Sequence, residues 1–192
     1  MEHDEEPHTE PERKEPLSEE QRESALRAIV GSDRATIVSA ATLLSGDPTT
    51  TDRLIPLLDT ASSADSRQGI LYALSWHGDI RIWRLMVRIL ANPQEAPVVR
   101  GQAAEGIAYM FSQVRPGTAE FELAAKALLS ALMDPSLEVR FGAIFALGAS
   151  NHLPFVPVLE ALVNDQTPVP GWVETIGEKA AAAIESLTWG KT

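Results

Sequence analysis

One pattern recurs five times along this chain and constrains its fold more than any other feature. Four copies begin with an arginine that is followed by apolar residues three, four and seven positions later, while the fifth copy begins with an alanine. Apolar side chains at this spacing share one face of an α-helix, so each copy predicts a helix with one buried face. The first positions are Arg34, Arg67, Arg100, Arg140 and Ala180, which are 33, 33, 40 and 40 residues apart.

A further apolar helix is predicted before each copy, and helix-breaking residues lie where the turns should fall. No segment alternates between apolar and polar residues over the length of a strand, so we expect almost no β-structure. A pair of helices that recurs every 30 to 40 residues predicts an all-α protein, an α-solenoid of about five helical hairpins. The expected turns contain Asp47-Pro48, Asn92-Pro93, Asp134-Pro135 and Thr167-Pro168.

The N-terminal residues differ from the rest of the chain in composition. The first 20 residues contain nine acids and two basic residues, so they carry −7 of the formal net charge of −11. They also contain three prolines and almost no apolar side chains, which cannot offset the entropy lost on ordering. We therefore expect a disordered acidic tail at residues 1–18 and a repeat domain at residues 19–192. The tail either keeps the protein soluble, is a remnant of cloning, or attracts a basic partner.

The segment from Asp134 to Ala143 joins an Asp-Pro turn to a helix that begins with a Val-Arg pair, and Val99-Arg100 repeats that pair. On these residues the chain resembles the HEAT-repeat family, especially its short bacterial members. The resemblance extends over roughly residues 20–188. It is weakest in the first copy, and the fifth copy lacks the basic residue. It implies a right-handed stack of hairpins in which the second helix of each hairpin lines a concave side.

The repeated arginines have two interpretations. In the first, each arginine pairs with the aspartate of the preceding turn or with a helix end, and so holds neighbouring hairpins in register. In the second, the arginines form a charged ladder that binds a ligand. The first interpretation is favoured, because buried arginines in stacked repeats need a local partner.

The sequence contains none of the common catalytic motifs. There is no glycine-rich phosphate loop, no H-E-x-x-H and no G-x-S-x-G. Cysteine is absent, which excludes disulfides and cysteine-ligated zinc, and His77 and His152 stand alone in predicted turns. We therefore expect a protein that is not an enzyme, with no catalytic, cofactor-binding or metal-binding residues. The acidic N-terminus and the lack of a long apolar run predict a cytoplasmic protein without membrane spans, either a monomer or a weak oligomer.

A second line of residues runs beside the apolar face of the predicted second helices. It takes positions one, five and nine after the first residue of each copy, which are four apart and therefore neighbours on a helix. These positions are rich in aromatic residues, although only 6% of the chain is aromatic. Such residues are common interface anchors, and packing between repeats is the competing explanation. The predicted partner-binding residues are Tyr72, Trp76, Glu105, Tyr109, Phe141 and Phe145.

These features favour a non-catalytic scaffold that binds a protein partner on its concave face. By analogy of fold, the resemblance suggests an immunity protein that inhibits a toxin or another basic protein. Two other HEAT-like functions remain as alternatives: a lyase or chaperone of the bilin-lyase type, and a DNA-binding repair protein. Nucleic acid is not the expected partner, because residues 21–192 hold 18 acidic against 14 basic residues. One basic stripe, Arg81, Arg84 and Arg88, is predicted on a first helix, on the convex side.

Overall fold

The computed structural model describes residues 16–189, and these residues contain α-helices, short 3-10 turns and no β-strand. The prediction of an all-α protein is confirmed for this part of the chain. Most of the predicted acidic tail, residues 1–15, lies outside the described residues. Ser18, which the prediction counted with the tail, is the N-cap of the first helix, and its hydroxyl accepts a hydrogen bond from the backbone N–H of Gln21.

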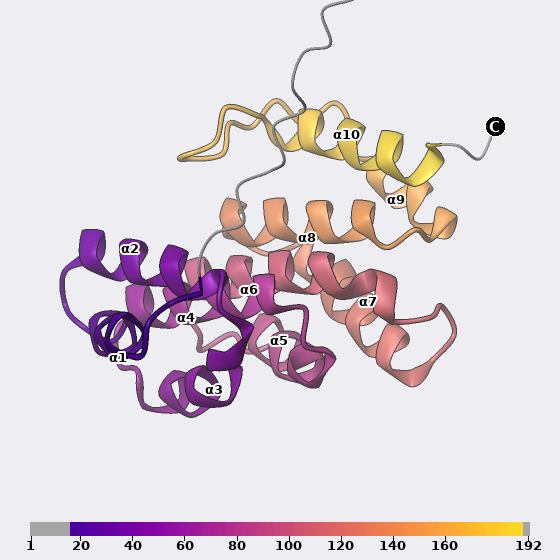
Figure 1. Cartoon of the computed structure of the whole chain (residues 1–192). Helices are drawn as coiled ribbons and strands as arrows, with labels where there is room; N and C mark the ends of the chain where they lie inside the picture. The colour runs from indigo at the N-terminus through magenta and orange to yellow at the C-terminus, as the bar shows by residue number, and fades with distance from the viewer. Residues whose placement is uncertain (1–15, 190–192) are drawn as a thin grey trace, which may run out of the picture.

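The helices form two layers (Figure 1). The odd-numbered helices are α1 (Glu19–Ala28), α3 (Thr51–Thr60), α5 (Trp83–Leu90), α7 (Ala119–Ala131) and α9 (Val156–Glu160). The even-numbered helices are α2 (Arg34–Ser45), α4 (Ala64–His77), α6 (Pro97–Met110), α8 (Leu137–Ala149) and α10 (Ile176–Thr188). Short 3-10 turns occur at Pro48–Thr50, Ile80–Ile82, Phe111–Gln113 and Leu153–Phe155.

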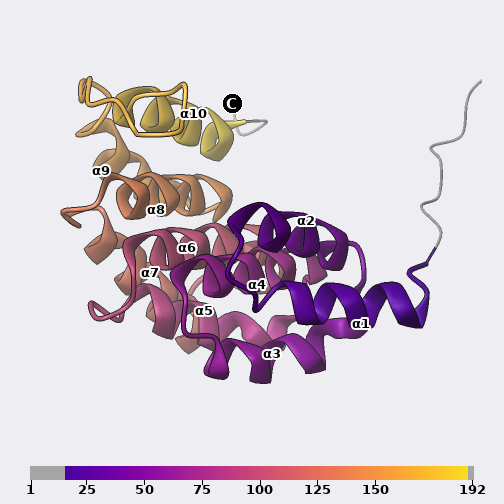
Figure 2. The same ribbon diagram turned by 90° about the vertical axis from the view of Figure 1, so that its left-hand side faces the viewer.

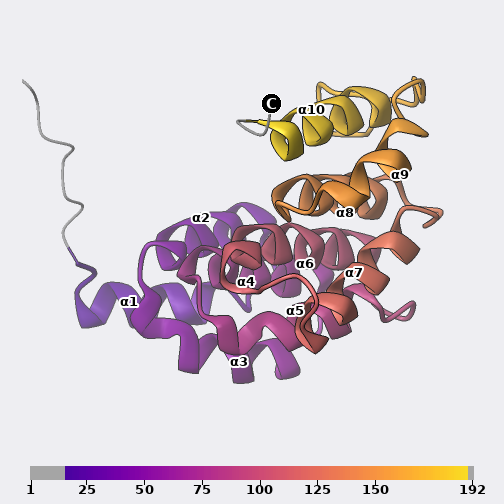
Figure 3. The same ribbon diagram turned by 90° about the vertical axis from the view of Figure 1, so that its right-hand side faces the viewer.

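The two layers differ in how closely their helices pack along the chain. Each even-numbered helix packs directly against the next one, from α2 through α10, and Figures 2 and 3 show α6, α8 and α10 stacked in this order. Among the odd-numbered helices of the described chain, only α5 and α7 pack closely together. We call the closely packed even-numbered helices the inner layer and the odd-numbered helices the outer layer.

The apolar pattern of the sequence predicts the core well in four of its five copies. In the second, third and fourth copies all nine side chains at the predicted core positions are fully buried. In the fifth copy Ala183 and Leu187 are buried, and Ile184 is partly buried. The helices of the second, third and fourth copies, α4, α6 and α8, each lie between two other even-numbered helices, so their periodic face has something to pack against on both sides.

The first copy differs from the prediction. Val38, a predicted core residue, is 55% exposed, whereas Ile37 and Ala41 are buried. The repeat in α2 begins at Ile37 instead of Arg34, since Ile37 is the fourth residue of its helix, as Arg67 is in α4. The residues three, four and seven positions after Ile37 are Ala40, Ala41 and Leu44, and all are buried.

Two glycines allow α6 and α8 to approach closely. A Cβ atom added to Gly142 would lie 2.8 Å from the carbonyl oxygen of Gly101, closer than a carbon and an oxygen can pack. The backbones of the two helices are therefore in direct contact at this point, in the middle of the inner layer.

The arginines of the second, third and fourth copies link successive hairpins. Arg100 pairs with Asp134 at 2.5 Å and donates a second hydrogen bond to the carbonyl of Leu90, the last residue of α5. Arg67 and Arg140 form equivalent ion pairs, with Glu95 and Asp165. The predicted helix-end contact is therefore present for Arg100. The acid comes from the following turn, however, and the prediction of the preceding turn is wrong.

Within the described residues, no helix is long and apolar enough to cross a membrane.

Candidate functional site

The predicted aromatic line lies on the inner layer, where α4, α6 and α8 contribute successive rows. Tyr72 and Trp76 lie one turn apart on α4, and Glu105 and Tyr109 lie one turn apart on α6. Phe145 follows on α8. Because the three helices pack side by side, residues at the same position of successive helices come together on one surface.

Four of these rings form a continuous chain. Tyr72 contacts Trp76 edge to face with centroids 6.3 Å apart, and Trp76 stacks on Tyr109 at 5.1 Å with an angle of 29° between the rings. Tyr109 contacts Phe145 edge to face at 5.8 Å. Trp76 is 54% exposed and Tyr109 is 42% exposed. These four residues, called the aromatic row below, thus pack against one another while two of them keep a large exposed area.

Phe141 is placed differently from the other predicted residues. It is 2% exposed, because Trp172 covers its ring at a centroid distance of 4.5 Å. Trp172 lies on the segment between α9 and α10, outside the stacked helices. In this arrangement Phe141 supports the surface from below and adds no exposed area to it.

Lys179 occupies the space between Phe141, Phe145 and Trp172. Its Nζ atom lies 4.6 Å from the centroid of Phe141, 5.0 Å from that of Phe145 and 5.9 Å from that of Trp172. The same atom is 3.3 Å from a carboxylate oxygen of Glu174. The three rings and the carboxylate hold one cation, an arrangement in which ring faces and an anion both attract positive charge.

Glu105 lies on α6 beside the aromatic row and is partly buried. Burial raises the pKa of its carboxyl above the ordinary value of 4.5, and the positive charge of Lys179 only partly offsets this effect. Its nearest hydrogen-bond contact is the side-chain amide of Gln102, at 3.5 Å. The pKa of the Tyr109 hydroxyl is also raised, chiefly by burial and further by the nearby carboxylate of Glu105.

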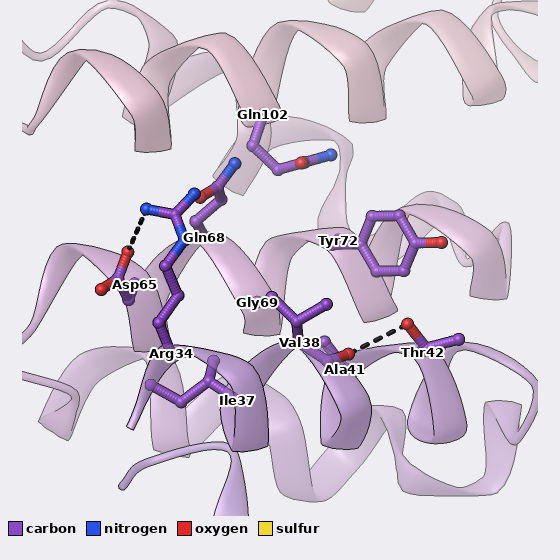
Figure 4. A pocket seen from close by; sticks show the side chains of 10 residues that line it. All are labelled: Arg34, Ile37, Val38, Ala41, Thr42, Asp65, Gln68, Gly69, Tyr72 and Gln102. Carbon is purple, nitrogen blue, oxygen red and sulfur yellow. Dashed lines mark hydrogen bonds and ion pairs between the residues drawn. The ribbon is translucent and has the colours of Figure 1, made fainter. Parts of the chain in front are cut away.

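A groove opens beside this row, where α2, α4 and α6 meet (Figure 4). Its volume is about 260 Å³. Arg34 and Asp65 form an ion pair at 3.2 Å at one end of the groove, Tyr72 lies at the other end, and Gln102 lines it from α6. Val38 also lines the groove, which explains its exposure: it belongs to the inner surface of α2.

Sequence reasoning missed several residues of this surface. The repeat pattern places Val38 in the core, because it counts from Arg34 as the first position. Trp172 has no repeat position, so no periodicity could place it over Phe141. Lys179 directly precedes Ala180, and a shift of one residue in the fifth copy would have shown a basic residue there. Gln102 lines the groove and is otherwise buried, and nothing in its sequence position distinguishes it.

The stripe of arginines on the outer layer is neutralised in part by neighbouring acids. Arg84 pairs with Glu120 at 2.7 Å, and Arg81 pairs with Asp79 at 2.6 Å. His77 contributes to the packing between hairpins, because its ring nitrogens contact the Thr51 hydroxyl at 2.8 Å and the Leu44 carbonyl at 2.9 Å. Across residues 16–189, no three histidine or acidic side chains gather closely enough to hold a metal ion.

Replacing Glu105 by glutamine should stabilise the protein at neutral pH. Because the folded-state pKa of Glu105 is raised, folding favours the protonated form, and the charged form opposes folding as pH rises through the folded pKa. Glutamine stays neutral, so Glu105→Gln should be more stable than the parent at pH 7. The difference should shrink toward pH 4.5 and below. Urea melts at a series of pH values measure it, and a variant less stable than the parent at pH 7 would contradict the raised pKa.

In comparisons with known proteins, no family model and no curated protein matches this sequence.

Proposed function

We propose that this chain is a HEAT-like, right-handed α-solenoid of about five hairpins that binds a protein partner on its inner face without catalysing a reaction. The observation that carries the proposal is the aromatic row, which runs across three successive helices of the inner layer with Trp76 and Tyr109 exposed. A rigid stack of helices offers such a surface without any chemistry of its own.

The exposure of the row supports binding over simple core packing. A core would cover both rings, yet Trp76 and Tyr109 together keep about half of their side-chain area open to water. Aromatic side chains that are fixed by their neighbours lose little entropy on binding and commonly dominate interface energies. The ring contacts of Trp76 with Tyr72 and Tyr109 fix it in this way.

The charges near the row favour a basic protein over nucleic acid. Glu105 lies beside the row, close enough for its carboxylate to raise the pKa of Tyr109. Phosphate groups would be repelled by this carboxylate, whereas the lysine and arginine residues of a basic protein would be attracted. Arg84 of the basic stripe is on α5, in the outer layer, and is already paired with Glu120. Inhibition of a basic toxin is the specific form of this proposal.

Alanine substitutions in the aromatic row should weaken partner binding at least about tenfold without unfolding the protein. We expect this for Trp76→Ala and for Tyr109→Ala, because both rings are exposed and neither fills the core. Arg84→Ala, which changes the outer layer, is the matched control and should bind as the parent does. The partner is first captured from cell extract and identified by mass spectrometry, and its affinity for each purified variant is then measured by calorimetry.

Three results would contradict the proposal. If the aromatic variants lose helical circular dichroism and cooperative melting, the rings belong to the core and the binding surface lies elsewhere. If they fold and bind as the parent does, the inner face is not the binding surface, although this result would leave the helical stack itself unchallenged. Loss of binding in Arg84→Ala alone would move the site to the outer layer.

A further inference from the structure

We propose that Glu105, with the exposed rings of Trp76 and Tyr109, binds an arginine side chain of the partner protein. This inference rests on the proposed function and names the chemistry that the inner face recognises. It comes from a comparison of two sites on the same surface, one of which already holds a cation.

The occupied site is the one around Lys179. There three rings, from Phe141, Phe145 and Trp172, surround the ammonium group, and Glu174 supplies a carboxylate at 3.3 Å. The chain itself therefore shows that aromatic side chains and a carboxylate on this face can hold a cation. Because Lys179 is partly buried and its charge is matched, this site is filled by the protein's own residue.

The second site has the same components in a neighbouring place. Trp76, Tyr109 and Tyr72 supply rings, and Glu105 supplies the carboxylate one helical turn from Tyr109. Phe145 belongs to both sites, since it contacts Tyr109 and lies beneath Lys179. In the described part of the chain no lysine or arginine nitrogen forms a salt bridge with Glu105, and Lys179 influences it only through longer-range attraction.

The state of Glu105 gives a reason for a cation to bind there. A partly buried carboxylate loses hydration, and a positive charge brought into contact restores the lost stabilisation. In the free protein its side chain has one long hydrogen bond, from Gln102 at 3.5 Å. A bound cation would therefore gain both the charge of Glu105 and the faces of the exposed rings.

The ring geometry favours arginine over lysine. Trp76 and Tyr109 stack on each other, with 29° between the ring planes and 5.1 Å between the centroids, so the ring face that is left for a ligand is the one turned away from the partner ring. A guanidinium group is flat, stacks on such faces and presents two parallel N–H donors to a carboxylate. An ammonium group is compact and strongly hydrated, and it fits an enclosed site such as that of Lys179 better than an open one.

The probe for this site is N-acetyl-arginine amide, with N-acetyl-citrulline amide as its neutral counterpart of the same shape. We expect the arginine probe to shift the indole N–H resonance of Trp76 at concentrations up to about 100 mM, because a single contact of this kind is weak. The citrulline probe should leave the resonance unchanged, and N-acetyl-lysine amide should bind less tightly than the arginine probe. The Trp76 resonance is assigned by its loss in Trp76→Phe.

Substitutions of Glu105 and Glu185 distinguish a direct contact with the arginine probe from general electrostatic attraction. Glu105→Gln should weaken binding of the arginine probe at least about fivefold, because it removes the charge that the guanidinium contacts. Glu185→Gln removes the same charge from an exposed position on α10 and should leave the affinity unchanged. Circular dichroism confirms that both variants remain folded.

The inference is wrong if the arginine probe causes no shift, if citrulline or lysine binds equally well, or if Glu105→Gln binds the probe as the parent does. These outcomes are distinct from failure of the proposed function. When Trp76→Ala loses the partner protein but Glu105→Gln binds that protein normally, the inner face is the binding surface and the arginine assignment fails. When Trp76→Ala binds the partner as the parent does, the proposed function itself fails.

Discussion

Leu147→Ala should lower the free energy of unfolding by about 2–5 kcal/mol. Leu147 lies on α8 at the seventh position after Arg140 and has no exposed area. It belongs to the helix that packs against both α6 and α10, so truncation leaves a cavity that neighbouring backbones restrain from closing. The direct contact of α6 with α8 at Gly142 limits relaxation further, which favours the upper part of this range.

A matched control for this substitution is Leu123→Ala on α7. Leu123 is 50% exposed, so its truncation should cost less than about 1 kcal/mol. Urea melts followed by circular dichroism give both values under identical conditions. A cost below about 1 kcal/mol for Leu147→Ala, equal to that of the control, would show that the packing of α8 is not as described.

Arg100→Ala should destabilise the protein by about 3 kcal/mol, near the lower limit measured for breaking buried ion pairs. The side chains of Arg100 and Asp134 are 13% and 8% exposed, so removal of the arginine leaves a nearly buried carboxylate without its cation. The substitution also removes the hydrogen bond that Arg100 donates to the carbonyl of Leu90 at the end of α5. One side chain thus connects two hairpins, and both connections are lost together.

Two comparisons test this explanation. Arg84→Ala removes an ion pair whose members are 74% and 41% exposed, and its cost should stay below about 1 kcal/mol. The double variant Arg100→Met with Asp134→Leu removes both buried charges and should recover most of the stability lost in Arg100→Ala. Thermal or urea melts that place Arg100→Ala and Arg84→Ala at the same stability would rule out a special contribution of the buried pair.

The core was predictable from the sequence where a helix has neighbours on both sides. The nine apolar residues at the repeat positions of α4, α6 and α8 are all buried, because stacking turns one periodic face into a continuous core. In α2 the same rule failed at Val38. This helix packs on α4 along one side and ends the inner layer, so an apolar residue there can face the groove.

The candidate site was predictable only in part. Sequence periodicity placed Tyr72, Trp76, Tyr109 and Phe145 on one line, because residues four apart share a helix face. It could not show that Phe141 is covered, since Trp172 reaches it from a segment outside the repeats. It could not show that Lys179 lies among the rings either, because one of the three rings, Trp172, comes from a segment outside the repeats.

The arginine pairs give the stack a direction along the chain. Each arginine belongs to one hairpin and meets an acid in the turn between the two helices of the next hairpin: Arg67 meets Glu95, Arg100 meets Asp134 and Arg140 meets Asp165. Hairpins are therefore not interchangeable units, because each of these arginines is neutralised by an acid of the next hairpin. A shortened chain that stopped after α8 would leave Arg140 without its carboxylate. In a chain lengthened by duplicating one hairpin, the arginines on both sides of the insertion would be paired only if every copy kept the acid in the turn between its two helices.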